Sequence, residues 1–139
     1  MSLTTPHLKL TQEGALLMLN AAVAKAQAMG QPQCIAIVDD GCNLLAFLRM
    51  DGAKLLSQQS ATNKAMTAAS SRTATGNVPE GVETKLALAT GGKVTNLKGG
   101  LPVVVNGLVI GGIGVGSGTG DQDLEVAQTA IAALLQALG

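Results

Sequence analysis

The spacing of apolar residues predicts a helix near the start of the chain. The apolar side chains recur every three or four positions, which is the period of one helix face: Leu16, Leu19, Val23 and Ala26. Thr11 is suited to cap the first turn. Gly30 is suited to end the helix, because glycine readily takes the left-handed conformation found there. We expect the apolar face to be buried.

Two pairs of short apolar runs predict β-hairpins. Residues 34–38 and 44–48 flank a turn that contains Asp40-Gly41. Residues 101–105 and 108–115 flank Asn106-Gly107, a pair in which both residues tolerate positive φ. Glycines within the last run weaken it as a bare strand, and they predict that another backbone or a ligand comes close there.

The remaining segments predict three more helices. Residues 55–69 carry a thin face of alanines that permits close approach to a neighbour. After a loop at residues 70–78, Pro79 is placed to open a short helix at its first position. Asp121 or Asp123 is suited to cap a final alanine-rich helix that reaches Leu138.

This order of elements predicts one domain, 1–139, of the α/β class in the α+β sense. The chain runs helix, two strands, two helices, two or three strands, helix, and has no internal repeat or linker. Because no strand–helix–strand alternation appears, the sheet should be mainly antiparallel, with helices packed on it.

Composition narrows the possible partners. Hydrophobic residues make up 47% of the chain and charged residues only 13%, so we expect copies of the chain to associate and cover apolar surface. Net charge is zero and Phe47 is the sole aromatic residue, which excludes nucleic acid as a partner. No apolar run is long enough to span a membrane and no signal peptide is seen, so we expect a cytoplasmic protein.

The cysteines and the histidine predict no metal site. Cys34 and Cys42 could bridge a hairpin, but in a chain without an export signal we expect them reduced. Their spacing fits no zinc pattern, and His7 lies at an end expected to be mobile.

Lys64 and the glycine-rich loop are the first candidates for ligand binding. Lys64 shares the helix with Ala61, Ala65 and Ala68, and either reaches solvent or presents its ammonium to an anion in a cleft. The loop Gly116 to Gly120 precedes a helix N-terminus and offers N–H groups to a phosphate, a carboxylate or a macrocycle edge. Tight packing of strand on helix is the alternative for these glycines. Their spacing is not that of a dinucleotide site.

Polar residues after the second strand form another candidate. Arg49 and Asp51 leave that strand together and either line a site or form a surface ion pair. Ser57, Ser60 and Thr67 supply hydroxyls, but no histidine base accompanies them, so the sequence does not favour Ser–His catalysis.

Three ordered motifs resemble those of the GlcG/HbpS-like family, whose members include the C-terminal domain of PduO-type cobalamin adenosyltransferases. The first comprises residues 38–41 (VDDG) and 45–53 (LAFLRMDGA), and the second is 61–68 (ATNKAMTA). The third comprises 99–102 (GGLP), 106–107 (NG) and 111–120 (GGIGVGSGTG), with Asp123 and Ala127. The resemblance covers nearly the whole chain, from about residue 10 to residue 133.

The resemblance implies a profilin-like or PAS-like antiparallel sheet of about five strands flanked by helices, assembled into dimers or larger oligomers. It also implies a pocket between the helix of Lys64 and the glycine strand. Some relatives bind haem or take part in its degradation, and others accompany glycolate or diol metabolism. The family usually shows Ser-Gly-Gly after Gly-Val, whereas Gly116 precedes Ser117 here. Haem iron is usually bound by a His, Cys, Met or Tyr side chain. Apart from the terminal histidine, the candidates here are Met50 and Met66.

These observations favour a pocket protein for a small ligand, either an anionic metabolite or a tetrapyrrole such as haem or a corrinoid. Glycolate or diol and cobalamin metabolism are the pathways that the resemblance implies. The expected ligand-binding residues are Arg49, Asp51, Lys64, Gly100, Pro102, Gly116, Ser117, Gly118 and Asp123. The alternatives are an enzyme acting on a small oxygenated metabolite, with Lys64 or Asp51 as acid or base, and a purely structural subunit.

Overall fold

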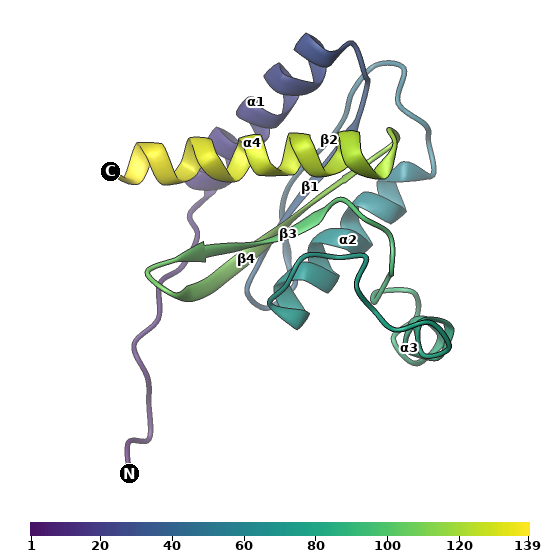
Figure 1. Cartoon of the computed structure of the whole chain (residues 1–139). Helices are drawn as coiled ribbons and strands as arrows, with labels where there is room; N and C mark the ends of the chain where they lie inside the picture. The colour runs from purple at the N-terminus through teal and green to yellow at the C-terminus, as the bar shows by residue number, and fades with distance from the viewer.

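A computed structural model describes all residues, 1–139, as a four-stranded antiparallel sheet with four helices (Figure 1). The helices are α1 (Gln12–Met29), α2 (Ser57–Ser71), α3 (Glu83–Ala89) and α4 (Gly120–Leu138). The strands are β1 (Cys34–Asp39), β2 (Leu44–Arg49), β3 (Gly100–Val105) and β4 (Leu108–Gly116), in the order β2-β1-β4-β3. The predicted class is confirmed. The sheet has four strands rather than about five, because the glycine run continues as one strand, β4, instead of breaking in two.

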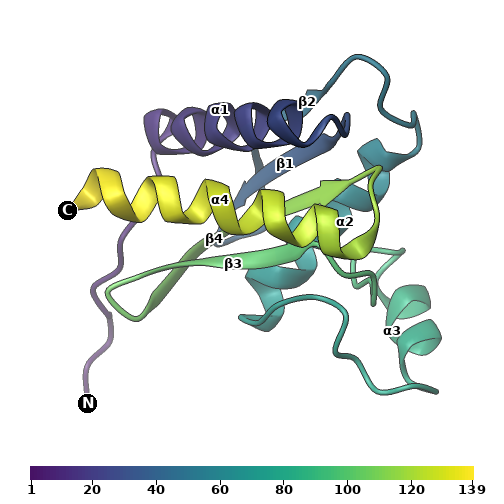
Figure 2. The same ribbon diagram turned by 45° about the horizontal axis from the view of Figure 1, so that its top comes forward.

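The sheet lies between two layers of helix. Figure 2 shows α1 and α4 side by side over one face, with α2 behind the other and α3 apart from the sheet. The larger core fills the α1–α4 side with side chains such as Met18, Ile37 and Ile113, all 0% exposed. The smaller core, on the α2 side, consists mostly of alanines.

The glycines of β4 bring α2 unusually close to the sheet. A Cβ atom on Gly114 would stand 1.9 Å from the carbonyl oxygen of Ala61, and one on Gly112 would stand 2.3 Å from that of Ala65. No side chain fits in such a gap. The predicted close approach at these glycines is therefore confirmed as an approach of backbone, and the thin alanine face of α2 is what meets it.

The hairpins form as predicted. β1 pairs with β2 and β3 pairs with β4, both antiparallel. Asn106 and Gly107 have φ of 52° and 77°, the positive values that a two-residue type I′ turn requires.

Several helix details differ from the sequence prediction. Thr11 and Gly30 cap α1 as expected, but Leu16 is 50% exposed. The buried face is made largely of smaller residues, because α1 packs against α4 as well as the sheet: Ala15, Met18, Leu19, Ala22 and Ala26. Helix α3 begins at Glu83 and not at Pro79, since a turn occupies residues 80–82.

The cap of α4 is Thr119 rather than an aspartate. Its hydroxyl accepts from the backbone of Gln122, whose side chain accepts in return from the backbone of Thr119. This reciprocal pair satisfies two N–H groups at once and leaves Asp123 free for another role.

Both cysteines are free thiols, and burial raises the pKa of each. None of the helices combines the length and apolarity needed to cross a membrane.

Candidate functional site

The structure divides six of the nine predicted ligand-binding residues between two hollows at one end of the sheet. Cys34, the first residue of β1, pairs with Arg49 on one side and with Gly116 on the other. These two neighbours therefore lie at the same end of the sheet. The residues around Arg49 line a hollow beside α1, and the residues after Gly116 line a hollow beside α2.

The hollow beside α1, here the α1–β2 hollow, has a volume of about 460 Å³. Its lining comprises Val23, Ala26, Gln27, Gly30, Gln31, Pro32, Leu48, Arg49, Met50 and Asp51. Arg49 and Asp51 form no ion pair, with each other or with any other residue, so the surface-pair alternative does not hold. The arginine is therefore available to an external anion.

The second hollow, here the α2–α4 hollow, is smaller, about 250 Å³, and only one of its lining residues is hydrophobic. Its lining comprises Lys54, Ser57, Ser60, Lys64, Leu97, Lys98, Ser117, Gly118, Gly120 and Asp123. It brings together four of the predicted residues, Lys64, Ser117, Gly118 and Asp123. Four further lining residues were not predicted: Lys54, Ser57, Ser60 and Lys98. A signal for the serines was present, because positions 57, 60 and 64 share one helix face.

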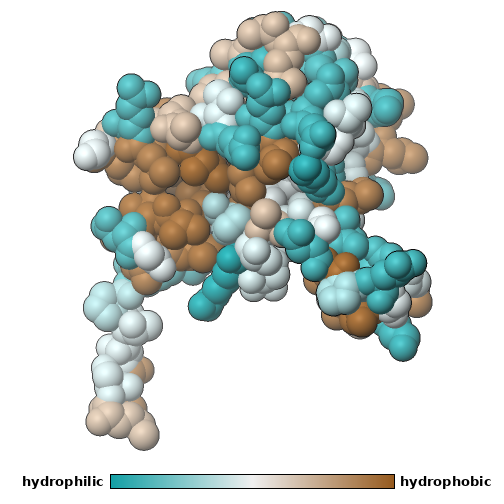
Figure 3. All heavy atoms as spheres, in the orientation of Figure 1, coloured by the Kyte–Doolittle hydropathy of each residue, from teal (hydrophilic) through white to brown (hydrophobic).

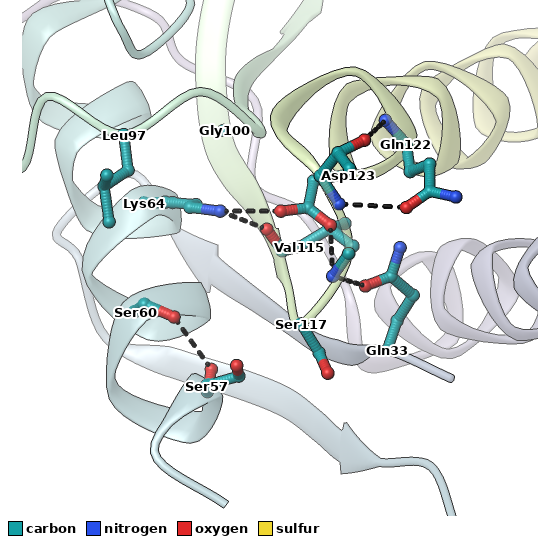
Figure 4. Close-up of polar contacts among 12 residues, drawn as sticks. Gln33, Ser57, Ser60, Lys64, Leu97, Gly100, Val115, Ser117, Gln122 and Asp123 are labelled. Carbon is teal, nitrogen blue, oxygen red and sulfur yellow. Dashed lines mark hydrogen bonds and ion pairs between the residues drawn. The ribbon is translucent and has the colours of Figure 1, made fainter. Parts of the chain in front are cut away.

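Lys64 reaches neither solvent nor an external anion. Only 4% of the residue is exposed, and its Nζ donates to the carbonyl oxygen of Val115 at 2.7 Å and to Oδ2 of Asp123 at 3.0 Å (Figure 4). The anionic partner of Lys64 is thus a carboxylate of the same chain, not an external ligand. A buried pair of this kind is stable only when both partners stay and further hydrogen bonds satisfy them.

Those further bonds come from the loop before α4. Oδ1 of Asp123 accepts from the backbone N–H of Gly118 at 3.0 Å, and the same N–H also points at Oε1 of Gln33, 3.0 Å away. Because Gly118 and Thr119 use their N–H groups internally, this part of the loop does not offer the free donors that the sequence suggested.

Two glycines at the start of β3, Gly99 just before it and Gly100 as its first residue, leave room for this ion pair. A Cβ on Gly99 would stand 2.7 Å from Cβ of Asp123, and one on Gly100 would stand 2.6 Å from the carbonyl oxygen of Lys64. Gly100 therefore packs against α2 rather than lining either hollow. Pro102 lies in β3 opposite Gly112, and Gly116 packs against Ser60, so these two also lie outside both linings.

The exposed rim of the α2–α4 hollow carries a second ion pair. Lys98 on the strand side bonds to Asp121 in the first turn of α4, and this contact lowers the pKa of the Asp121 carboxyl. Each carboxylate beside the hollow therefore already has a lysine partner.

The single histidine, His7, lines neither of these hollows but a third one. Nε2 of His7 is 3.0 Å from Oδ2 of Asp40. Cys42 and Arg72 line the same hollow, which has a volume of about 320 Å³ and few apolar residues.

Comparison with known proteins gives a consistent result. A family model described as haem degrading protein HbpS-like matches residues 10–132. Klebsiella pneumoniae protein ORFY, a solved structure, is 31% identical with a TM-score of 0.91, covering 97% of each chain. The structure of a PduOC–haem complex is 34% identical with a TM-score of 0.83, covering 91% of this chain and 95% of that one. The corrinoid adenosyltransferase PduO of Salmonella typhimurium is 36% identical over 93% of this chain, which spans only 42% of that protein.

Proposed function

Because the chain belongs to the HbpS-like family, we propose that it is a small-ligand-binding protein whose ligand is a tetrapyrrole of the haem type. The observation that carries the proposal is the composition of the α1–β2 hollow. Apolar walls stand there beside one thioether, from Met50, and one unpaired guanidinium, from Arg49. The relative solved with haem supports the choice of ligand.

The donor set of this hollow fits haem in three respects. Sulfur of methionine is an axial ligand that haem iron accepts. An arginine without an acidic partner suits a propionate of the macrocycle, since guanidinium and carboxylate form strong paired hydrogen bonds. Val23, Ala26 and Leu48 supply the apolar surface against which a flat ring would lie. When bound, haem supplies a redox-active iron whose reactivity depends on its axial ligand.

The ligand test is a titration with ferric haem followed by absorption. The unaltered protein is expected to bind saturably, and Met50→Leu to lose the spectrum of a thioether-bound iron. Arg49→Gln should weaken binding by about tenfold or more, the size of one hydrogen bond to a charged group. Met66→Leu is the matched control, because Met66 packs against the small core on the other face of the sheet.

Two outcomes would contradict this placement. If Met50→Leu changes nothing while His7→Ala abolishes the iron spectrum, haem binds in the hollow of His7 instead. If neither the unaltered protein nor any variant binds haem saturably at any concentration, haem is not the ligand of this chain. A parallel titration with a corrinoid tests the second tetrapyrrole, which the likeness to the corrinoid adenosyltransferase suggests.

The enzyme alternative has less support. Lys64 is held by two internal acceptors, and Asp51 lies exposed at the rim of the α1–β2 hollow. An acid or base at either residue would need a reacting neighbour. The result that would favour the enzyme alternative is turnover of a small oxygenated metabolite that is lost in Asp51→Asn. Accessory roles in glycolate or diol metabolism are part of the same proposal.

Self-association is the remaining proposal. Figure 3 shows hydrophobic atoms gathered over the C-terminal half of α4 and the β3–β4 hairpin, elements that carry the exposed Val104, Leu135 and Leu138. Sedimentation at micromolar concentration should show a dimer or larger, and Leu135→Glu should shift it toward the monomer. Leu88→Glu, at a position 79% exposed on α3, should have no such effect. A single 13.9 kDa species for the unaltered protein would contradict the proposal.

A further inference from the structure

The α2–α4 hollow has the composition of a binding site in its own right. Leu97 is its single apolar lining residue, and three lysines and three serines contribute to its wall. We propose that it is a second site, separate from the α1–β2 hollow, and that it binds a small oxyanion, a carboxylate or a phosphate, through Lys54.

The charges around the hollow leave one cation without a partner. Lys64 is neutralised by Asp123, and Lys98 by Asp121. Lys54 makes no ion pair, although it lines the hollow with them. An external anion is therefore what would complete the charge balance there.

The hydroxyl groups also lack acceptors. Ser57 is 8% exposed, and its Oγ makes no hydrogen bond within the protein. Ser117 Oγ accepts from the backbone N–H of Lys54 at 2.9 Å, which leaves its own proton to donate. Ser60 donates only to a distant carbonyl oxygen, 3.4 Å away. These hydroxyl groups open onto the hollow, so a ligand entering it would meet protons that are still free to be donated.

The three serines lie on two sides of the hollow. Figure 4 shows Ser57 and Ser60 on α2 opposite Ser117, with the contact between Lys64 and Asp123 closing one end. The groups that remain free there are the ammonium of Lys54 and the serine hydroxyls, all of which can donate, because the carboxylate of Asp123 already accepts from Lys64 and Gly118. An excess of donors around a cation selects an oxyanion, whose oxygens accept several hydrogen bonds at once.

The volume limits the ligand to a small molecule. About 250 Å³ lies below the usual range for drug-sized ligands, 300–1,000 Å³. A carboxylate or phosphate with a few further heavy atoms fits, and a macrocycle does not. The two hollows would thus hold ligands of different size and chemistry.

The test uses inorganic phosphate and acetate as probes, each titrated into the full-length protein and followed by backbone amide NMR shifts. The expected result is saturable shifts at Lys54, Ser57 and Ser117 with at least one probe. Lys54→Gln should weaken that binding by about tenfold or more. Lys85→Gln is the matched control, because it removes an unpaired surface charge on α3.

Each outcome decides the proposal. Saturation by phosphate alone or acetate alone identifies the oxyanion, and Lys54→Gln with an unchanged melting midpoint separates binding from folding. Equal weakening by Lys54→Gln and Lys85→Gln would mean general charge attraction and would overturn the site, as would the absence of saturable shifts with both probes. Haem affinity measured on Lys54→Gln should match the unaltered protein, so failure here is distinguishable from failure of the haem proposal.

Discussion

Lys64→Met is expected to lower the free energy of unfolding by about 3–5 kcal/mol, because it leaves the buried carboxylate of Asp123 without a counter-charge. Methionine retains most of the packing volume of the lysine stem, so the loss would come from charge rather than from a cavity. The carbonyl oxygen of Val115 loses a donor in the same change. Urea denaturation measures the effect.

A double variant separates the ion pair from a general intolerance of the position. Lys64→Met combined with Asp123→Leu removes both charges, and replacing a whole buried pair by apolar residues is often close to neutral. We expect the double variant to be more stable than Lys64→Met alone. Lys98→Met, in the exposed pair with Asp121, should leave the urea midpoint nearly unchanged. A double variant as unstable as the sum of the two single changes would contradict the assignment.

Gly114→Ala is the second change expected to have a large effect, about 3 kcal/mol or more. The added Cβ would meet the carbonyl oxygen of Ala61 at 1.9 Å, and backbone cannot turn away as a side chain does. Relief requires α2 to move away from the sheet, which opens the small core. Overpacking of a close-packed core commonly costs 1–3 kcal/mol, and this contact lies at the severe end.

The matched control for that change is Gly116→Ala, two residues further along the same face of β4. Its Cβ would meet the flexible hydroxyl of Ser60 at 3.0 Å, which can rotate aside. We expect a clearly smaller loss of melting temperature than in Gly114→Ala. Equal effects of the two substitutions would mean that loss of glycine itself, and not contact with α2, sets the cost.

The fold could be predicted largely because its signals are local. Thr11, Gly30 and Asn106-Gly107 act on their own turns, and short-range chemistry decides their conformation. The buried stripe of α1 was predicted wrongly at Leu16, since the position of α4 determines which side of that helix is covered.

The candidate site was less accessible to sequence reasoning. The sequence left Lys64 either reaching solvent or binding an external anion, and the structure shows neither, because the fold brings Asp123 to it across 59 residues. Arg49 and Lys64 were both expected to bind one ligand. The sheet separates them. Arg49, at the end of the edge strand β2, lines the hollow beside α1, whereas Lys64 belongs to α2, which covers the opposite face. Lys54 was not predicted to bind a ligand, because no sequence pattern distinguishes an unpaired lysine from a paired one.

The contact between β4 and α2 has a consequence for how a ligand would be received. Behind the α2–α4 hollow, the wall that carries Ser57 and Ser60 meets the wall that carries Ser117 through main chain. Gly112 and Gly114 of β4 rest there on the carbonyl oxygens of Ala65 and Ala61. The spacing of the two walls therefore has almost no conformational freedom to lose. A small oxyanion entering there would meet a preorganised set of donors, and the entropy spent on ordering the protein would be small.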